Sequence, residues 1–320
     1  MNSPTDSQCP VCLIGAGKPV PETHVDSGVT YTLHECEACG VQFWLPFKNP
    51  GAEWYERDER YAGRNRDPLL EPTWKHRETI SFFKSFAGSV LDVGCGTGNF
   101  LHYARARGWR VKGIDFDADA IRAGQEVFKL SDLEVADLAG FRKRHPGDRF
   151  DLITFFDVLE HIDNHRNFME GVRALAKPRG YIAMSMPYGK HAAWLMRNDV
   201  PPRHLTRWTR RALRMFLERE GFDLVEMKRV TEGIRFIILK LRFKYGRLFS
   251  FGMVDKVKQS VRKEASIEVG SKAERTVNFA KTLASLKDAV IFGIPALVIW
   301  VAMLPSKKRY VTLFCIARKR

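Results

Sequence analysis

A chain of 320 residues is long enough for one α/β domain of roughly 150 to 200 residues together with smaller attachments. A hydrophobic fraction of 45% and a charged fraction of 28% are typical of folded proteins, which excludes a disordered chain and a polytopic membrane protein. The net charge of +15 favours an anionic partner: nucleic acid, an anionic membrane surface or a phosphorylated substrate. The N-terminus lacks the pattern of a secretory signal, so we expect a cytoplasmic location.

The first segment, residues 1–45, carries four of the six cysteines in two closely spaced pairs. Cys9 and Cys12 form one pair, and Cys36 and Cys39 form the other. Two such pairs in a chain without an export signal indicate metal binding rather than disulfides. Four thiolates complete a closed tetrahedral site, so we predict a small ribbon built around a structural zinc ion. A redox dithiol is the alternative for either pair alone.

Residues 46–88 are rich in aromatic and charged side chains, with helical periodicity from about Glu71 to Phe86, and we expect a connector and lid there. From residue 89 onwards, short apolar runs alternate with helical stretches. This alternation predicts a mainly parallel sheet with helices on both faces. The predicted strands are 90–93, 111–115, 133–136, 150–156, 181–186, 222–230 and, after an insertion, 310–317. The predicted segments are therefore 1–45, 46–88, 89–230, 231–309 and 310–320.

A glycine-rich turn follows the first strand of this sheet. Glycines at this point let the backbone turn tightly and approach a ligand at the start of the next helix. An acidic residue, Asp115, ends the next strand, where a carboxylate can accept both hydroxyls of an adenosine ribose. The glycines alone would fit an ordinary strand–helix turn or a nicotinamide or flavin enzyme. The residues of the turn are Asp92, Gly94, Gly96 and Gly98.

The glycine turn and the second acid together resemble the class I S-adenosylmethionine-dependent methyltransferase family, over about residues 88–230 and the terminal strand. The resemblance implies a doubly wound, seven-stranded Rossmann-like sheet and S-adenosylmethionine as the cofactor. It places Asp92 near the amino-acid end of the cofactor, Gly94 and Gly96 along it, and Asp115 at the ribose. Asp137 matches the position that meets the adenine amino group, with a solvated or helix-capping aspartate as the alternative.

The fourth strand runs into the segment Asp157-Val-Leu-Glu160-His161, and in the family this end of the strand faces the transferred methyl. Methyl transfer to a hydroxyl requires alignment and removal of a proton, so His161 is a candidate base. A second interpretation makes Asp157 and Glu160 the capping box of the following helix.

A third interpretation joins Asp157, Glu160, His161 and His204 around a divalent ion. The segment resembles the E-x-x-E-H metal motif of some quinone and RNA-end methyltransferases, with aspartate at the first position. Candidates for the acceptor pocket are His204 and two aromatic residues that are equally typical of packing, Tyr188 and Trp208. The two remaining cysteines, Cys95 and Cys315, are expected to be packing residues.

The insertion at 231–309 is basic and then apolar. Residues 231–288 hold 13 lysines and arginines against six acidic residues, and 289–304 has sixteen residues without a charge, interrupted by Pro295. The apolar run is shorter than the roughly 20 residues that span a bilayer. Because basic residues flank it on both sides (Lys281, Lys287, Lys307, Lys308 and Arg309), we predict that 231–308 docks on the cytoplasmic face of a membrane. A buried helical hairpin or a dimer contact is the alternative, and the oligomeric state stays open.

The two cysteine pairs, the aromatic run Trp54-Tyr55…Tyr61 and the class I core resemble bacterial methyltransferases encoded among polysaccharide-, sugar- and lipid-modifying enzymes. The resemblance implies O-methylation of a small-molecule, glycan or lipid-linked acceptor. The competing classes are an RNA methyltransferase, suggested by the charge and the zinc ribbon, and a non-catalytic S-adenosylmethionine-binding module. The fourth strand lacks the Asn/Asp-Pro-Pro-aromatic signature of base N-methylation and a nucleophilic cysteine, which disfavours nucleic acid. The intact glycine turn and His161 disfavour a non-catalytic module.

Overall fold

The computed structural model describes residues 8–51, 54–55, 70–86, 88–189, 199–231, 233–245, 290–306 and 309–320. The chain divides into two compact units. The larger unit comprises Met1–Lys190, Arg197–Val230 and Thr312–Arg320, and the smaller comprises His191–Met196 and Thr231–Val311. The larger unit contains two sheets.

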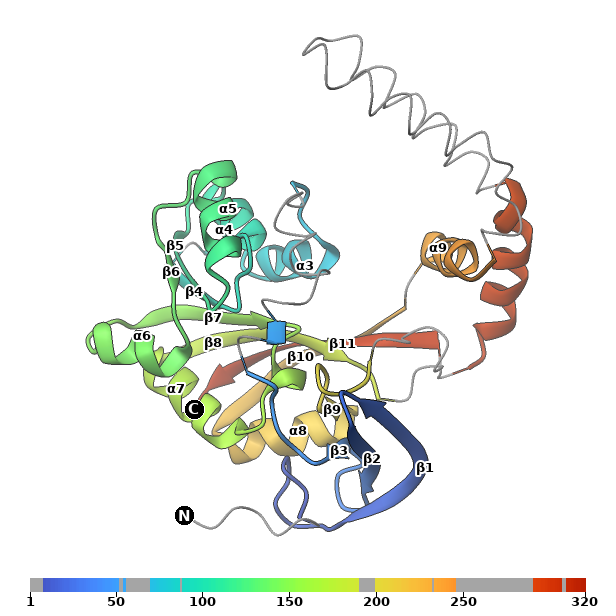
Figure 1. Cartoon of the computed structure of the whole chain (residues 1–320). Coiled ribbons are helices and arrows are strands. Elements are labelled where there is room, and N and C mark those ends of the chain that lie inside the picture. Colours follow the sequence, from blue (N-terminus) through green and yellow to red (C-terminus); the bar gives the residue numbers. More distant parts are fainter. Residues whose placement is uncertain are drawn as a thin grey trace. The chain divides into compact units, whose positions relative to one another are not determined.

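The main sheet has seven strands in the order β10-β11-β8-β7-β4-β5-β6 (Figure 1). Strands β8, β7, β4, β5 and β6 run parallel, and β11 is antiparallel to β8. This order confirms the predicted doubly wound, seven-stranded sheet with a last strand returning into it. The strands are β4 (Ser89–Val93), β5 (Arg110–Asp115), β6 (Leu133–Val135), β7 (Phe150–Phe156), β8 (Ala176–Pro187), β10 (Phe222–Thr231) and β11 (Tyr310–Lys319).

Helices cover both faces of this sheet, as Figure 1 shows. One face carries α3 (Trp74–Phe82), α4 (Asn99–Arg105) and α5 (Ala118–Phe128), and the other carries α6 (Leu138–Arg144), α7 (His165–Leu175) and α8 (Arg210–Arg219). Side-chain caps start several of them: Asp117 accepts from the amides of Asp119 and Ala120 at α5, and Thr209 caps α8. Buried aromatic and aliphatic residues fill the layer under α3, α4 and α5, among them Ile80, Phe83, Phe100, Leu101, Ile121, Phe128 and Phe314.

The strand order reverses between β4 and β7, which are parallel neighbours. In an open parallel sheet, a ligand crevice forms outside the carboxyl ends of the strands at such a point. The glycine turn follows β4 and the Asp157–His161 segment follows β7. The topology therefore brings the two predicted halves of the active site to the same edge of the sheet.

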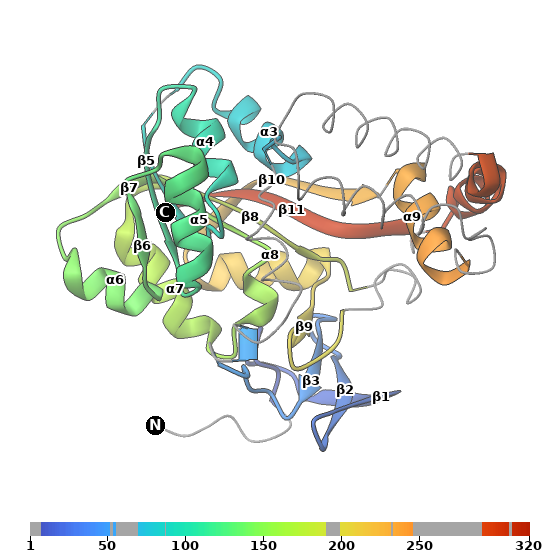
Figure 2. The same ribbon diagram turned by 45° about the horizontal axis from the view of Figure 1, so that its top comes forward.

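The second sheet joins the N-terminal segment to a strand from much later in the chain. Its antiparallel order is β1-β2-β3-β9 (Figure 2). The β-prone runs 29–33 and 41–45 of the sequence overlap β2 and β3, whereas β1 and β9 were not predicted. In β9, Arg207 is the register partner of Gln42, and Thr206 is that of Phe43. The strands are β1 (Gly17–Asp26), β2 (Val29–Cys36), β3 (Gln42–Leu45) and β9 (Thr206–Arg207).

The smaller unit is helical where it is described. It contains α9 (Ile234–Tyr245) and a helix at 290–303. Among the described residues, no helix has the length and hydrophobicity needed to cross a bilayer. The expectations for Tyr61, for 246–289 and for the lysines at 281, 287, 307 and 308 concern positions outside the described residues.

Candidate active site

The glycine turn after β4 is held against the end of β5. The amides of Gly94 and Cys95 both donate to the carbonyl oxygen of Ile114, at 2.8 and 3.0 Å. Gly94 has φ of 71°, and a Cβ there would lie 2.7 Å from Val158 Cγ2, so only glycine fits. Gly96 has φ of 53°, and a Cβ there would meet nothing within 4 Å. The turn therefore has open space in front of Gly96, where a ligand can approach the backbone.

Asp115, at the end of β5, faces this turn. Its Oδ2 accepts from the amide of Gly96 at 2.8 Å and its Oδ1 accepts from the amide of Asp117 at 3.0 Å. Burial raises the pKa of this carboxyl. Two ionised carboxylate oxygens offer about four acceptor positions, so each oxygen retains capacity for a further donor. This arrangement fits the predicted contact with two ribose hydroxyls.

The other two predicted cofactor acids have different surroundings. Asp92 is buried, its Oδ1 accepts from the Thr154 hydroxyl at 2.6 Å, and burial raises its pKa to about 7. Asp137 is exposed and caps α6, since its Oδ1 accepts from the amide of Gly140 at 2.7 Å. The helix-capping interpretation of Asp137 is therefore confirmed, and its contact with an adenine stays a prediction.

The end of β7 has a left-handed residue at Asp157, with φ of 55°. Asp157 accepts from the Ser185 hydroxyl at 2.6 Å and forms an ion pair with Lys75 of α3. Although desolvation opposes its charge, these two partners lower the pKa of Asp157 to about 2. The capping-box interpretation was wrong, because Leu159–His161 is a single 3-10 turn whose N-cap is Val158, without a side-chain cap.

Glu160, His161 and His204 form a second cluster beside this ion pair. One potential ligand atom of each lies within 4.8 Å of the others. Glu160 is fully buried, and neither of its carboxylate oxygens has a hydrogen-bond partner among the described residues. Burial, followed by the charge of Asp157, raises the pKa of Glu160. Asp157 itself is not part of this group, so the structure reduces the predicted four-residue set to three.

The two imidazoles of the cluster have assignable tautomers. His161 Nδ1 lies 2.6 Å from the carbonyl oxygen of Arg203, and His204 Nδ1 lies 2.7 Å from Asp199 Oδ1. A carbonyl or carboxylate oxygen only accepts, so each Nδ1 carries a proton and each Nε2 is the nitrogen left for a ligand. Burial, and then the neighbouring His204, lower the pKa of His161 to about 3. The His161 ring is thus neutral, and each of the two rings offers one nitrogen that can bind a cation.

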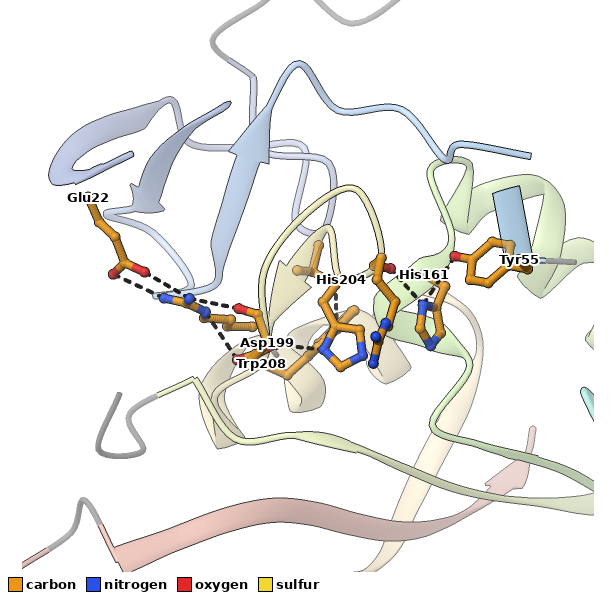
Figure 3. A network of polar contacts seen from close by, with 9 residues as sticks. Glu22, Tyr55, His161, Asp199, His204 and Trp208 are labelled. Atoms are coloured by element: carbon orange, nitrogen blue, oxygen red, sulfur yellow. Dashed lines mark hydrogen bonds and ion pairs between the residues drawn. The ribbon is translucent and has the colours of Figure 1, made fainter. Parts of the chain in front are cut away.

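Polar contacts continue from His204 to the N-terminal sheet, as Figure 3 shows. Asp199 also forms an ion pair with Arg207, and Arg207 donates two hydrogen bonds to the carboxylate of Glu22 in β1. Tyr55 lies at the other end of the network, with its hydroxyl 3.3 Å from His161 Nδ1.

Sequence reasoning missed several of these residues. Lys75 pairs with Asp157, Asp199 contacts His204, and Arg207 pairs with Asp199. None of these three residues belongs to a spaced motif. Trp208, in contrast, is fully buried and packs edge-on against Phe216, which confirms the packing alternative. Other residues found to be buried are Tyr188, Cys95 and Cys315.

The four N-terminal cysteines converge on one point. The Sγ atoms of Cys9 and Cys39 are 3.8 Å apart, those of Cys12 and Cys36 are 3.6 Å apart, and all four thiols lie within 4.8 Å of one another. These separations exceed a disulfide bond. A tetrahedral ion with metal–sulfur bonds of about 2.3 Å requires sulfur–sulfur separations of about 3.8 Å. The buried thiols therefore fit a tetrahedral metal ion.

Comparisons with known proteins point to one family. A family model described as a methyltransferase domain matches residues 54–227. The ubiquinone biosynthesis O-methyltransferase of Ralstonia nicotianae is 31% identical over 155 residues, which cover 47% of this chain and 63% of the relative. The enzyme of the same name from Thiobacillus denitrificans is 32% identical over 100 residues, which cover 30% of this chain and 43% of the relative. The chain thus spans about half the length of these relatives.

The fold is also shared with a solved structure. Phosphoethanolamine N-methyltransferase 2 of Haemonchus contortus, in complex with S-adenosyl-L-methionine, superposes with a TM-score of 0.53 at 14% identity. The match covers 93% of this chain and 71% of that one. At 14% identity this match shows a shared fold only.

Proposed function

Because this chain belongs to the methyltransferase-domain family, we propose that it transfers the methyl group of S-adenosylmethionine to a hydroxyl of a small-molecule acceptor. The observation that carries the proposal is the convergence of the glycine turn, Asp115 and the Glu160–His161–His204 cluster at one edge of the sheet. The names of the relatives, O-methyltransferases of ubiquinone biosynthesis, support a hydroxyl acceptor.

The cofactor would lie along the open side of the glycine turn. Asp115 would accept from the ribose hydroxyls, Gly94 and Gly96 would line the cofactor, and Asp92 would lie near its amino-acid end. Asp137 would meet the adenine from the start of α6. The sulfonium supplies an activated methyl group, so these residues need only bind and orient it.

The cluster of Glu160, His161 and His204 would hold a divalent ion. A fully buried carboxylate without hydrogen-bond partners in the described structure is costly unless a cation or proton neutralises it. One nitrogen of each neighbouring imidazole would complete a mixed nitrogen and oxygen donor set. Such an ion lowers the pKa of a bound hydroxyl, which is the chemistry that O-methylation requires. The low pKa of His161 makes the ring a weak base and favours the ligand role.

The N-terminal cysteines would hold a structural zinc ion. The set Cys9, Cys12, Cys36 and Cys39 leaves no open coordination position, so this ion would stabilise the short sheet and take no part in methyl transfer.

The decisive test of the activity is transfer of labelled methyl from S-adenosylmethionine to an extract fractionated into lipids, small water-soluble compounds and RNA. We expect label in the lipid or small-molecule fraction, and we expect it to resist alkali, as a methyl ether does. Label confined to RNA would refute the proposal in favour of the nucleic-acid alternative, and no transfer to any fraction would favour a non-catalytic module.

We also propose that the smaller unit binds an anionic membrane surface through the helix at 290–303. The exposed side chains of this helix and the turn after it form one apolar face, whereas Phe292 and Ala296 are buried on the opposite side. At 100° per residue the exposed valine, leucine and isoleucine side chains fall within about 120° of arc. They are Val290, Ile294, Leu297, Val298, Val301 and Leu304, with 39% to 74% of their surface exposed.

Charge supports lipid as the occupant of this face. Residues 231–309 hold 16 lysines and arginines against six acidic residues, so they carry ten of the chain's 15 net positive charges. This charge attracts an anionic lipid surface and repels a second copy of the same segment. An acceptor held in or on the membrane, glycan-bearing or lipid-linked, would then lie within reach of the enzyme.

Co-sedimentation with vesicles tests this contact. The intact chain should pellet with phosphatidylglycerol-containing vesicles at low salt and much less with phosphatidylcholine alone. The double substitution Ile294→Glu and Val298→Glu should release it, because both charges lie within the apolar face. Retention of the intact chain in the supernatant with both lipids would refute the membrane contact without affecting the proposed methyl transfer.

A further inference from the structure

We propose that Asp199 and Arg207 are positioning residues that hold His204 in a single tautomer and orientation, and that the cysteine-bearing N-terminal sheet anchors them through Glu22. The inference rests on the proposed function, because it assigns a role to side chains behind the Glu160–His161–His204 cluster. Figure 3 shows the side chains of this network and the elements from which they come.

The first step is the contact between Asp199 and His204. Asp199 is fully buried, and its Oδ1 lies 2.7 Å from His204 Nδ1. The His204 side chain is 13% exposed, and its ring centroid lies 4.8 Å from that of His161. The buried carboxylate therefore fixes the proton on Nδ1 and leaves the lone pair of Nε2 for the cluster. A carboxylate or carbonyl behind a ligating imidazole is the usual way in which proteins orient such a ring.

The second step is the support of Asp199 by Arg207. Arg207 Nε lies 3.1 Å from Asp199 Oδ2, and its Nη2 donates to the Asp199 carbonyl at 2.8 Å. Arg207 is itself 7% exposed. A buried carboxylate requires such a counter-charge to stay ionised. Arg207 thus supplies a positive charge beside the carboxylate that accepts from His204 and holds that carboxylate in place.

The third step leads to the N-terminal sheet. Arg207 Nη2 and Nη1 donate to the two oxygens of Glu22 at 2.9 and 3.2 Å, a paired contact that fixes the plane of the guanidinium. Arg207 also lies in β9, the partner strand of β3, and its guanidinium is 5.2 Å from the ring of Trp44. The Trp44 amide donates to the carbonyl of Leu205 at 3.0 Å. The segment that follows His204 is therefore part of the N-terminal sheet, which also carries the four cysteines.

The substitution Asp199→Asn distinguishes a role of Asp199 in positioning His204 from a role in packing alone. An asparagine has one acceptor oxygen, and the charged Arg207 is the stronger donor, so the oxygen should turn to Arg207. The amide nitrogen would then face His204 Nδ1, which must become the acceptor. The proton would move to Nε2, and the lone pair that faces the cluster would be lost.

The experiment is long-range ¹H–¹⁵N correlation NMR of the full chain with ¹⁵N-labelled histidine, with His204 assigned from its loss in His204→Gln. The native protein should show His204 protonated at Nδ1, and Asp199→Asn should show it protonated at Nε2. Methyl transfer should fall by about 10- to 100-fold, as for other residues behind metal ligands. S-adenosylmethionine affinity should be unchanged. An unchanged His204 tautomer in a folded Asp199→Asn protein would overturn the proposal.

The role of the N-terminal sheet has its own matched pair of variants. Glu22→Gln removes the charge that holds Arg207, whereas Glu37→Gln removes an exposed carboxylate of the same segment, which pairs with Lys18. We expect a several-fold loss of activity and a broadened His204 signal in Glu22→Gln only. Equal activity and equal His204 signals in the two variants would overturn the anchoring role of the N-terminal sheet. This comparison can be made even if Asp199→Asn does not fold. A changed tautomer with full activity would instead confirm the positioning and refute the part of His204 in the proposed reaction.

Discussion

Replacement of Asp115 by asparagine probes the cofactor site at the residue where the geometry is most constrained. Both carboxylate oxygens already accept a backbone amide, Oδ2 from Gly96 and Oδ1 from Asp117. An asparagine must turn its NH₂ group toward one of these N–H donors. That amide loses its partner, at a cost of about 1–3 kcal/mol, whether or not the cofactor is bound. This cost therefore lowers the stability of the protein, but it is the same in the free and cofactor-bound states and does not change the affinity.

The effect on affinity comes from the ribose. The NH₂ group cannot accept from a hydroxyl, so one charge-assisted hydrogen bond worth about 1.5–3 kcal/mol is lost. This loss corresponds to a weakening of about 10- to 150-fold in the dissociation constant. Titration calorimetry with S-adenosylmethionine measures it, and Asp119→Asn, an exposed residue of the first turn of α5, serves as the charge-matched control. An affinity within threefold of the native value in Asp115→Asn would show that this carboxylate does not hold the ribose.

Three further outcomes are expected. Protein prepared under reducing conditions should contain about one zinc per chain, and Cys36→Ser should lose it; zinc-free native protein would exclude the structural ion. His161→Ala should slow turnover by roughly 10²-fold with unchanged cofactor affinity. Native enzyme that has lost activity after chelation should recover it when divalent ions are added. An enzyme whose activity is insensitive to chelation would contradict the role of His161 as a metal ligand. The depressed pKa of Asp157, about 2, stabilises the fold above pH 4 and loses this contribution as the pH falls toward 2. The difference in unfolding free energy between native protein and Lys75→Met, measured with urea, should therefore shrink over that range, and a constant difference would disprove the ion pair.

The parts of the fold that sequence reasoning predicted are those governed by local pattern. The strand at 150–156 is fully apolar apart from Asp151 and Thr154, and its predicted bounds coincide with β7. The glycine turn is also local, since its backbone angles demand glycine at positions two residues apart. Helix α3 is shorter than predicted, because it begins after Thr73 and ends at Phe82.

The parts that the pattern missed depend on partners remote in the chain. Strand β1 contains Pro19 and Pro21 and lies at the edge of its sheet, with a register irregularity between Pro19 and Thr23, so it shows little hydrophobic alternation. The capping box failed for a similar reason. Asp157 is drawn into a left-handed conformation at the end of β7, with its side chain bound by Ser185 and Lys75, and neither partner can be identified from the Asp157–His161 motif itself.

The pairing of β9 with the edge of β3 affects how this protein folds during synthesis and how it can be truncated. During synthesis the N-terminal strands leave the ribosome long before residues 206–207 exist, so the edge of β3 waits unpaired until most of the catalytic domain has emerged. Such an open edge is a site for pairing with another nascent chain, and the long delay gives this region a high contact order. A fragment that ends after Leu45 would carry the same open edge permanently. The N-terminal segment is accordingly not a transplantable module, and truncation studies of this protein should keep it together with residues 199–209.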